Sequence, residues 1–258
     1  MKSSQYWDKA WSLVDGCTPC SLGCENCWSM SMNKRFGKWP EKVTPRYDRL
    51  ELPRKWTKSY VWSVWNDLYH LAVSDGFISE ALRVIESCPE DTFLVLTKRV
   101  ERMAQFMKSV PMSLNNLWSG LTVCNQQEAD EKIPQLLQVP GHKWLSIEPM
   151  LGPIDITMAL EEFQAFDPNY NRKPAPINAV VVGCETGPHR RPCKIEWIQS
   201  IVDQCKAAGV PCFVKQIEVE TMTVTFERGV SNPKLQVVHE LEEFPESLRV
   251  RELPWRTK

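Results

Sequence analysis

The sequence has no long apolar run: nowhere in its 258 residues does a stretch approach the roughly 18–20 apolar residues of a membrane helix. The N-terminal stretch MKSSQYWDKAWS also lacks the apolar segment of a secretory signal. Because the formal net charge is −1, no overall field draws the chain to nucleic acid or to an anionic membrane. We therefore expect a cytoplasmic protein that does not associate with membranes.

The composition is that of a globular protein, with 43% hydrophobic and 24% charged residues. A chain of this length can bury a sizeable core in one large or two small domains. It contains ten cysteines. In the cytoplasm such thiols stay reduced or bind metals more readily than they form disulfides.

Short runs rich in β-branched and aromatic residues recur along the chain, separated by stretches with apolar residues at helical spacing. The expected strands lie at 10–16, 60–65, 92–97, 116–123, 143–148, 178–183 and 211–216. Strand then helix, repeated about six times, predicts an α/β fold of parallel strands with right-handed crossovers. The pattern fits an open doubly wound sheet as well as a full or partial barrel. After Gln216 a small hairpin and a polar tail are expected, which divides the chain into 1–217 and 218–258.

Polar residues cluster where the expected strands end. Because the carboxyl ends of parallel strands meet at one edge of a sheet, functional side chains concentrate there. The candidates are Asn66, Asp67, Thr97, Lys98, Thr122, Asn125, Ser146, Glu148, Glu185, Lys215 and Gln216. Any single one could instead cap the helix that follows it.

The stretch CTPCSLGCENC places Cys17, Cys20, Cys24 and Cys27 within one short loop. A two-knuckle zinc site separates its cysteine pairs by about 15–20 residues, a far longer gap than the one between Cys20 and Cys24. Four zinc ligands from so short a loop would be cramped. Short loops do wrap a [4Fe–4S] cluster, because sulfides bridge its irons. The spacing favours a cluster and leaves zinc as the alternative.

Residues 34–58 combine nine Lys or Arg and three acidic residues with Phe36, Trp39, Tyr47 and Trp56. Basic residues interleaved with rings are typical of a nucleic-acid contact. A solvated loop with its tryptophans anchored in the core has the same composition. The segment alone does not separate the two interpretations.

Six stretches carry a resemblance that composition and spacing do not show. They are GCTPCSLGCENCW (16–28), NDLYH (66–70), LTKRVERM (96–103), SIEPMLGPI (146–154), VVVGCETGPHRRP (180–192) and CFVKQ (212–216). In them the chain resembles a phage-associated branch of radical-SAM-like proteins, of the radical S-adenosylmethionine (SAM) superfamily. The resemblance implies a partial (β/α)6-type TIM barrel with an N-terminal cysteine-rich cluster loop and a small C-terminal β-appendage.

The resemblance also implies a [4Fe–4S] cluster, bound by three cysteines, whose open iron binds SAM. Cys24 and Cys27 are ligands in either pattern. The third is Cys20 by the superfamily's Cys-x3-Cys-x2-Cys spacing, or Cys17 by the branch's Cys-x6-Cys-x2-Cys spacing, and we expect Cys20. An external electron donor of the flavodoxin or ferredoxin type would reduce the cluster.

The implied roles follow from position. Residues expected to bind SAM are Asn66, Asp67, Thr97, Lys98, Ser119, Thr122 and Ser146. Glu148, Glu185 and Lys215 would contact substrate polar groups or act as acid and base. Arg190 and Arg191 in GPHRRP are forks suited to phosphate or carboxylate.

The implied activity is hydrogen abstraction from a substrate C–H bond, in the host cytoplasm if a phage encodes the protein. The phage association suggests a hypermodified pyrimidine of DNA, or a nucleotide, as the substrate. A radical SAM enzyme acting on a small metabolite or peptide is the first alternative. A zinc-stabilised nucleic-acid-binding protein, using the same cysteines structurally, is the second.

Overall fold

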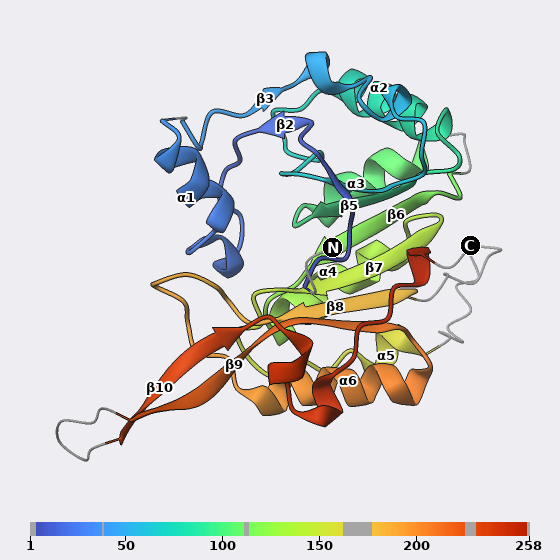
Figure 1. The fold of residues 1–258 in the computed structure, drawn as a ribbon. Helices are drawn as coiled ribbons and strands as arrows, with labels where there is room; N and C mark the ends of the chain where they lie inside the picture. Colours follow the sequence, from blue (N-terminus) through green and yellow to red (C-terminus); the bar gives the residue numbers. More distant parts are fainter. Residues whose placement is uncertain (1–3, 38, 111–113, 162–176, 225–230, 257–258) are drawn as a thin grey trace.

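The computed structural model describes residues 4–37, 39–110, 114–161, 177–224 and 231–256 (Figure 1). Within these residues eight strands form one sheet: β1 (Lys9–Trp11), β4 (Val61–Val64), β5 (Thr92–Thr97), β6 (Leu117–Thr122), β7 (His142–Ile147), β8 (Ala179–Gly183), β9 (Cys212–Val224) and β10 (Ser231–Val238). A small second sheet pairs β2 (Val14–Asp15) with β3 (Thr44–Pro45). The helices are α1 (Trp28–Arg35), α2 (Asp75–Glu86), α3 (Val100–Lys108), α4 (Gln126–Leu137), α5 (Thr157–Leu160) and α6 (Ile195–Ala208).

The strands of the large sheet follow one another in chain order. β1, β4, β5, β6, β7, β8 and β9 are all parallel, and β10 returns antiparallel to β9. A doubly wound sheet reverses its strand order at one point, and this sheet does not. The predicted α/β class and parallel sheet are confirmed, and each predicted run overlaps a strand.

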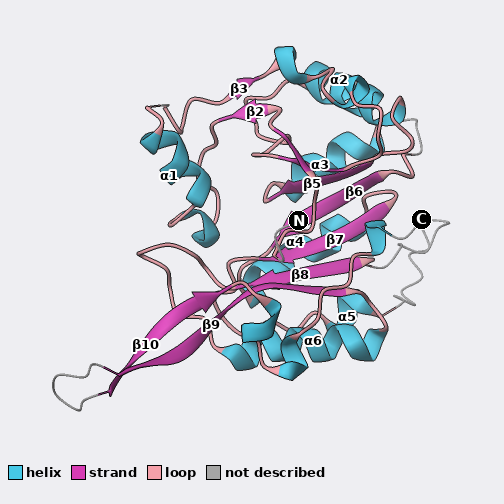
Figure 2. Cartoon of the chain, in the orientation of Figure 1, coloured by secondary structure: helices cyan, strands magenta, loops and turns pink. Residues whose placement is uncertain are grey.

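The two faces of the sheet are covered differently. Along β5, Phe93 and Val95 belong to the core under the helices, whereas Leu94 and Leu96 belong to a cluster on the opposite face. This alternation follows from the two-residue period of a strand. Figure 2 shows α1 apart from the other helices, beyond the end of the sheet. The face opposite the helices is called the cavity face below.

Both ends of the chain cover the cavity face. Trp255, near the C-terminus, packs edge to face against Tyr6 and Trp144, and its indole donates to the Tyr6 carbonyl over 3.0 Å. Gly120 makes room for the Trp144 ring, because a Cβ there would lie 2.4 Å from the indole. This packing fills the cavity face near the start of the strands and leaves their carboxyl ends open.

The C-terminal part forms the expected hairpin, in which β9 and β10 pair from Ile217↔Val238 to Val224↔Ser231. β9 runs without a break through residue 217, so the hairpin is an extension of the parallel sheet (Figure 1). Among the described residues, no helix is both long and apolar enough to span a bilayer.

Candidate functional site

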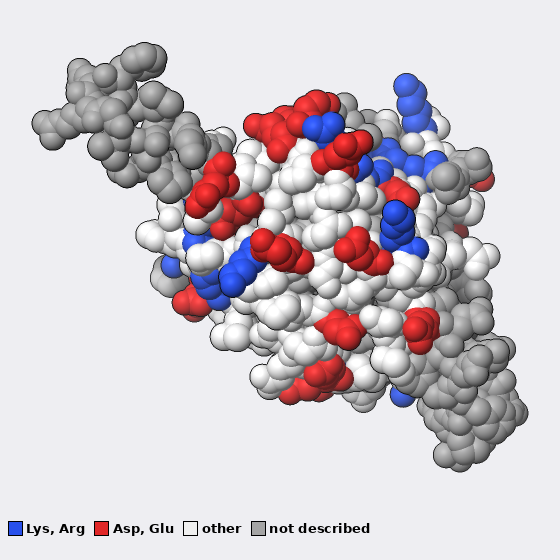
Figure 3. All heavy atoms as spheres, turned by 90° about the horizontal axis from the view of Figure 1, so that it is seen from below, with Lys and Arg blue, Asp and Glu red and all other residues white. Residues whose placement is uncertain are grey.

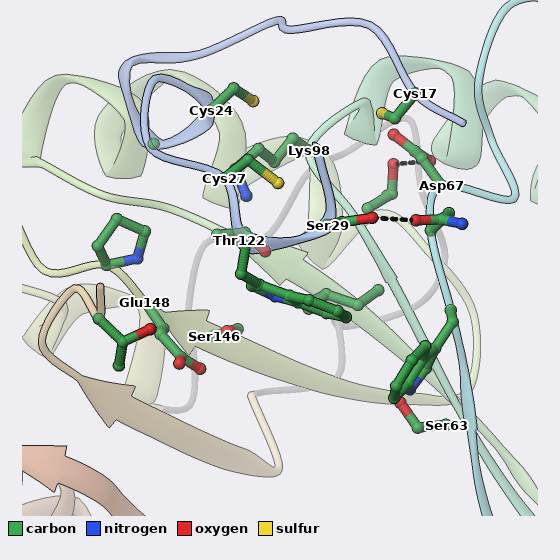
Figure 4. Close-up of a pocket in the computed structure, with 18 of the residues that line it drawn as sticks. Cys17, Cys24, Cys27, Ser29, Ser63, Asp67, Lys98, Thr122, Ser146 and Glu148 are labelled. Carbon is green, nitrogen blue, oxygen red and sulfur yellow. Dashed lines mark hydrogen bonds between the residues drawn. The ribbon is translucent and has the colours of Figure 1, made fainter. Parts of the chain in front are cut away.

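A cavity of about 420 Å³ opens at the carboxyl ends of the parallel strands (Figure 4). Its lining comes from the cysteine loop, the N-terminal segment and the ends of β4 to β9. It brings together almost all the predicted site residues: Cys17, Cys20, Cys24, Cys27, Asn66, Asp67, Thr97, Lys98, Thr122, Ser146, Glu148, Glu185 and Lys215. A volume of this size falls within the range of small-molecule sites.

Among the predicted site residues, Ser119, Asn125 and Gln216 do not line the cavity: Asn125 Oδ1 accepts from the Glu128 N–H and caps α4, and Gln216 is fully buried. Ser119 is also buried. On β6 the cavity face is taken by Trp118 and Thr122, and Ser119 is offset from them by one and three positions, both odd numbers. Successive side chains of a strand alternate faces, so Ser119 belongs to the helix-covered side. The cavity therefore does not bring Ser119 together with the other residues expected to bind SAM.

The cysteine loop packs directly on the end of β6. A short 3-10 turn, Leu22–Cys24, begins at Ser21, whose hydroxyl accepts from the Gly23 N–H. A Cβ at Gly23 would lie 2.3 Å from the Cys124 sulfur, so only glycine permits this approach. The loop then runs into α1, with Cys27 as the N-cap residue.

Lys98, after β5, lies against the loop. Its Cε would be 3.4 Å from a Cβ at Gly23. Burial alone would lower the pKa of Lys98, but the fields of Cys124 and Cys24 outweigh burial and raise it. Figure 4 shows Lys98 beside Cys24 and Cys27. A lysine here stabilises negative charge on the loop sulfurs.

Two of the thiols form a pair. The interaction between Cys20 and Cys24 lowers the pKa of Cys24 to about 4 and raises the pKa of Cys20. A lowered pKa favours the thiolate, the form in which cysteine binds metals. Cys17 lies elsewhere in the loop, where its sulfur accepts from Arg99 Nη1 over 3.8 Å. Burial, then the charge of Asp67, raises the pKa of Cys17.

Asp67 is held by protein groups. Its carboxylate accepts from Arg99 Nη1 over 2.5 Å, from Thr97 Oγ1 over 2.7 Å and from the Tyr69 N–H over 3.0 Å. Arg99 in turn donates to the Thr18 carbonyl over 2.7 Å. Asp67, one of the residues expected to bind SAM, thus takes part in contacts that fix the first half of the cysteine loop.

Asn66 has a similar tethering role. It adopts φ +60°, and its side chain donates to the Val14 carbonyl and accepts from Ser29 Oγ over 2.7 Å (Figure 4). Ser29 lies in the first turn of α1. Asn66 therefore ties the end of β4 to the helix that follows the cysteine loop.

Glu185 fixes the second half of the loop. One oxygen accepts from Asn26 Nδ2 over 3.0 Å and from the Arg191 N–H over 2.7 Å; the other accepts from Arg191 Nη2 over 2.6 Å. Arg191 also donates to the Leu22 carbonyl over 3.0 Å. Burial alone would raise the pKa of Glu185, but the hydrogen bonds from Arg191 and Asn26 outweigh it and lower the pKa.

Most of the arginines that the sequence suggested for binding phosphate form ion pairs with carboxylates of the protein. Arg190 contacts the nearly buried Glu218 over 2.9 Å, and Arg191 contacts Glu185. Within the basic segment, Arg46 and Arg49 pair with Asp15, and Arg54 pairs with Glu51. These guanidinium groups hold parts of the fold together. The lysines and Arg35 therefore supply the positive charge of the segment 34–58.

Glu148 and Lys215 form an ion pair on the cavity wall. Lys215 Nζ and Gln216 Nε2 both contact Glu148 Oε1, over 2.6 and 2.8 Å. Gln216 is fully buried, and its side-chain amide also donates to the Cys184 carbonyl over 2.7 Å, while its side-chain oxygen Oε1 has no partner in the described structure. Burial would lower the pKa of Lys215, but Glu148 outweighs it and raises the pKa.

Comparison with known proteins identifies the family. The sequence profile described as "Protein of unknown function (DUF5131)" matches residues 2–237. The chain belongs to the DUF5131 family. No curated protein and no solved structure matches it.

The DUF5131 chain has the donors for a cluster. Among its described residues, no three His, Cys, Asp or Glu side chains converge closely enough to hold one metal ion. A [4Fe–4S] cluster does not require such convergence, because different irons take different cysteines. Four thiols at one cavity, one with a lowered pKa and a lysine beside them, fit a cluster by their chemistry.

Sequence reasoning missed several residues of the DUF5131 cavity. Trp7, Trp28 and Trp65 line it, and Asn26 anchors the loop. Asn26 gave no signal, because its partner is 159 residues away in the chain. Trp65 could have been found, since it precedes Asn66 at the end of a predicted strand.

Proposed function

We propose that this DUF5131 protein is a radical SAM enzyme with a [4Fe–4S] cluster in its cysteine loop. The observation that carries the proposal is the convergence of the four loop cysteines with Lys98, Glu148 and Lys215 on one cavity at the strand ends. A structural zinc clip would have no need of a cavity lined by strand-end polar residues. An enzyme places its reacting groups at this edge of parallel strands.

The fold supports this function. Seven consecutive parallel strands in chain order, with a cavity at their carboxyl ends, suit a partial (β/α)6-type TIM barrel followed by the β9–β10 appendage. Such an arrangement gives a deep site. Tyr6 lines the site, and Trp255 packs edge to face against its ring.

We assign Cys20, Cys24 and Cys27 as the cluster ligands. All three line the cavity, and negative charge on them would raise the pKa of Lys98. Cys17 is engaged by Arg99 instead and would hold the loop in place. When bound, the cluster and SAM supply removal of a hydrogen atom from an unactivated C–H bond of the substrate.

Lys98 is the residue best placed to hold the SAM carboxylate, since it is a cation beside the loop. Thr122 and Ser146 supply hydroxyls for the ribose on the cavity face. Asn66 and Asp67 are positioning residues in this scheme, because their side chains are already bonded to the loop and α1. Their expected contact with the SAM amino group is reassigned accordingly.

Glu148 and Lys215 would handle the substrate. Glu148 follows the end of β7, and Lys215 lies in the part of β9 that pairs with β8, on the side of the sheet away from β4. Joined by a short contact, the two can bind a polar substrate group or move a proton between carboxylate and amine. Glu185 is reassigned from catalysis to positioning. An external electron donor of the flavodoxin or ferredoxin type completes the scheme.

The test is anaerobic reconstitution of the full chain with iron and sulfide. The proposal expects about four irons per chain, and an EPR signal after dithionite that changes when SAM is added. Cys20→Ala, Cys24→Ala and Cys27→Ala should each abolish that signal. Cys17→Ala should keep it, as should the control Cys88→Ala, whose thiol does not line the cavity. A colourless protein retaining one tightly bound zinc would overturn the proposal.

A further inference from the structure

Most of the large apolar side chains that are exposed among the described residues lie in one segment of the sequence. Of the ten large apolar side chains exposed among the described residues, seven lie between residues 22 and 56: Leu22, Trp28, Met32, Phe36, Trp39, Tyr47 and Trp56. Isolated exposed apolar residues are ordinary, but a concentration of them marks an interaction site. This region begins at the cysteine loop and includes all of α1.

Helix α1 presents a single line of these side chains. Trp28, Met32 and Phe36 recur every four residues and are 53%, 42% and 67% exposed. Residues spaced in this way share one side of a helix, about 6 Å apart along its axis. None of the α1 residues is buried, so the helix contributes no apolar side chain to the core. Trp39, 82% exposed, follows the helix.

The line is continuous with the cavity. Trp28 is the first residue of α1 and also lines the cavity, where its ring meets Trp65 edge to face at 5.2 Å. Trp65 meets Trp7 in the same way at 5.6 Å, and both rings line the cavity. A row of indoles therefore leads from the outside of α1 to the site of the proposed chemistry.

The charge beside the line is positive. Lys34 and Arg35 are exposed in the last turn of α1, and Lys42 is exposed beyond it. By contrast, the face seen from below, nearest α6 in Figure 1, carries acidic side chains interspersed with fewer basic ones (Figure 3). Phosphate would be attracted to the α1 side and not to that face.

We propose that Trp28, Met32, Phe36 and Trp39, which we call the α1 track, bind a single nucleic-acid strand that delivers one base into the cavity. The inference rests on the proposed function and names its substrate class. Rings in a row with flanking cations suit an extended strand, whose bases stack on aromatic side chains while Lys and Arg meet its phosphates. A globular protein partner would call for a broader patch. The base entering the cavity would lie against Trp65, with Glu148 and Lys215 available to its polar edge.

The test measures fluorescence anisotropy of fluorescein-labelled (dT)12 with the full chain, under reducing anaerobic conditions, before cluster reconstitution. Phe36→Ala and Trp39→Ala should each weaken binding about tenfold, because each removes one stacking platform. The control Met158→Ala, which removes an exposed side chain of α5, should leave affinity within about twofold. Trp28→Phe should restore most of the affinity lost in Trp28→Ala.

Charge gives a second readout. Lys34→Gln combined with Arg35→Gln should flatten the slope of log affinity against log salt by about 1.4, the value expected for two lost phosphate contacts on a single strand. Lys206→Gln, a matched change in the last turn of α6, should leave the slope unchanged. Thermal unfolding of each variant identifies any that fails to fold.

The inference is overturned if (dT)12 does not bind, or if the ring variants bind it as well as Met158→Ala does. It is also overturned if Lys34→Gln/Arg35→Gln slows reduction of the reconstituted protein by flavodoxin without changing (dT)12 affinity, since the track would then dock a protein. Because binding is measured before reconstitution, (dT)12 binding by a protein that never assembles a cluster supports the track and rejects only the proposed enzyme.

Discussion

The guanidinium of Arg99 joins Asp67 to the cysteine loop. Its Nη1 donates to Asp67 over 2.5 Å while its Nη2 donates to the Thr18 carbonyl over 2.7 Å. The two side chains are only 12% and 9% exposed. The end of β4, the start of α3 and the loop before Cys20 are therefore fixed by one ion pair, and a change in either partner should be felt at the loop.

We expect Asp67→Ala to lower the free energy of unfolding by about 3–5 kcal/mol, because it leaves the Arg99 charge largely buried without its partner. Urea denaturation measures this. Glu51→Ala is the matched control: its pair with Arg54 is 54% and 40% exposed and should contribute at most about 1 kcal/mol. Equal losses in the two variants would show that the Asp67 pair does not secure the loop.

Glu185 should act through the loop and not on the substrate. Glu185→Gln places an N–H₂ group among the donors Asn26 and Arg191, so amide hydrogen exchange across Cys20–Cys27 should accelerate about tenfold or more. Glu196→Gln, an exposed change on α6, should not alter it. Unchanged exchange together with lost SAM cleavage would return Glu185 to a catalytic role.

Lys143 should make the protein more stable as the pH rises from about 8 to about 10. The side chain is 1% exposed, and burial lowers its pKa to about 8, below the value near 10.4 of an unfolded lysine. Between these values the unfolded chain binds more protons than the folded chain, so the free energy of unfolding increases with pH. Below about pH 8 the full penalty of the buried charge remains.

Replacing Lys143 with Met should therefore raise the free energy of unfolding at pH 7 by about 1–3 kcal/mol, a gain reduced by the lost hydrogen bond to the Gly141 carbonyl. The substitution should also abolish the increase in unfolding free energy between about pH 8 and about pH 10. Chemical denaturation at pH 7 and pH 9.5 measures both effects. If the stability of Lys143→Met still increased with pH as that of the wild type does, another titrating group would be responsible for the increase.

The sequence was sufficient to predict the sheet and the gathering of polar residues at its edge. Strand periodicity and the following polar residues are local signals, and they located Thr122, Ser146 and Glu148 on the cavity. The same period places Ser119 on the opposite face from Thr122, because the two are three positions apart, an odd number. The prediction for Ser119 did not apply this period within the strand.

The partners of the polar residues could not be predicted. Arg99 meets Thr18 across 81 positions of sequence, and Asn26 meets Glu185 across 159. No periodicity connects residues so distant. The sequence identifies Asp67 and Glu185 as strand-end carboxylates, but only the fold shows that arginines already occupy them.

Gly23 and Cys124 provide the sharpest test of how the loop sits. A Cβ at Gly23 would lie 2.3 Å from the Cys124 sulfur, so Gly23→Ala should cost about 1–3 kcal/mol of unfolding free energy and reduce iron incorporation. Cys124→Ala removes the obstructing sulfur. The double variant should lose less unfolding free energy than the sum of the losses in the two single variants, and the difference should be about 1–2 kcal/mol.

Gly76→Ala is the matched control, because the nearest atom to a Cβ there is Ser74 Oγ at 4.0 Å and the residue lies in α2. It should leave stability unchanged or raise it by up to about 1 kcal/mol. Urea denaturation of the three loop variants and the control gives the cycle. Strictly additive losses from Gly23→Ala and Cys124→Ala would mean that the cysteine loop does not rest on the end of β6.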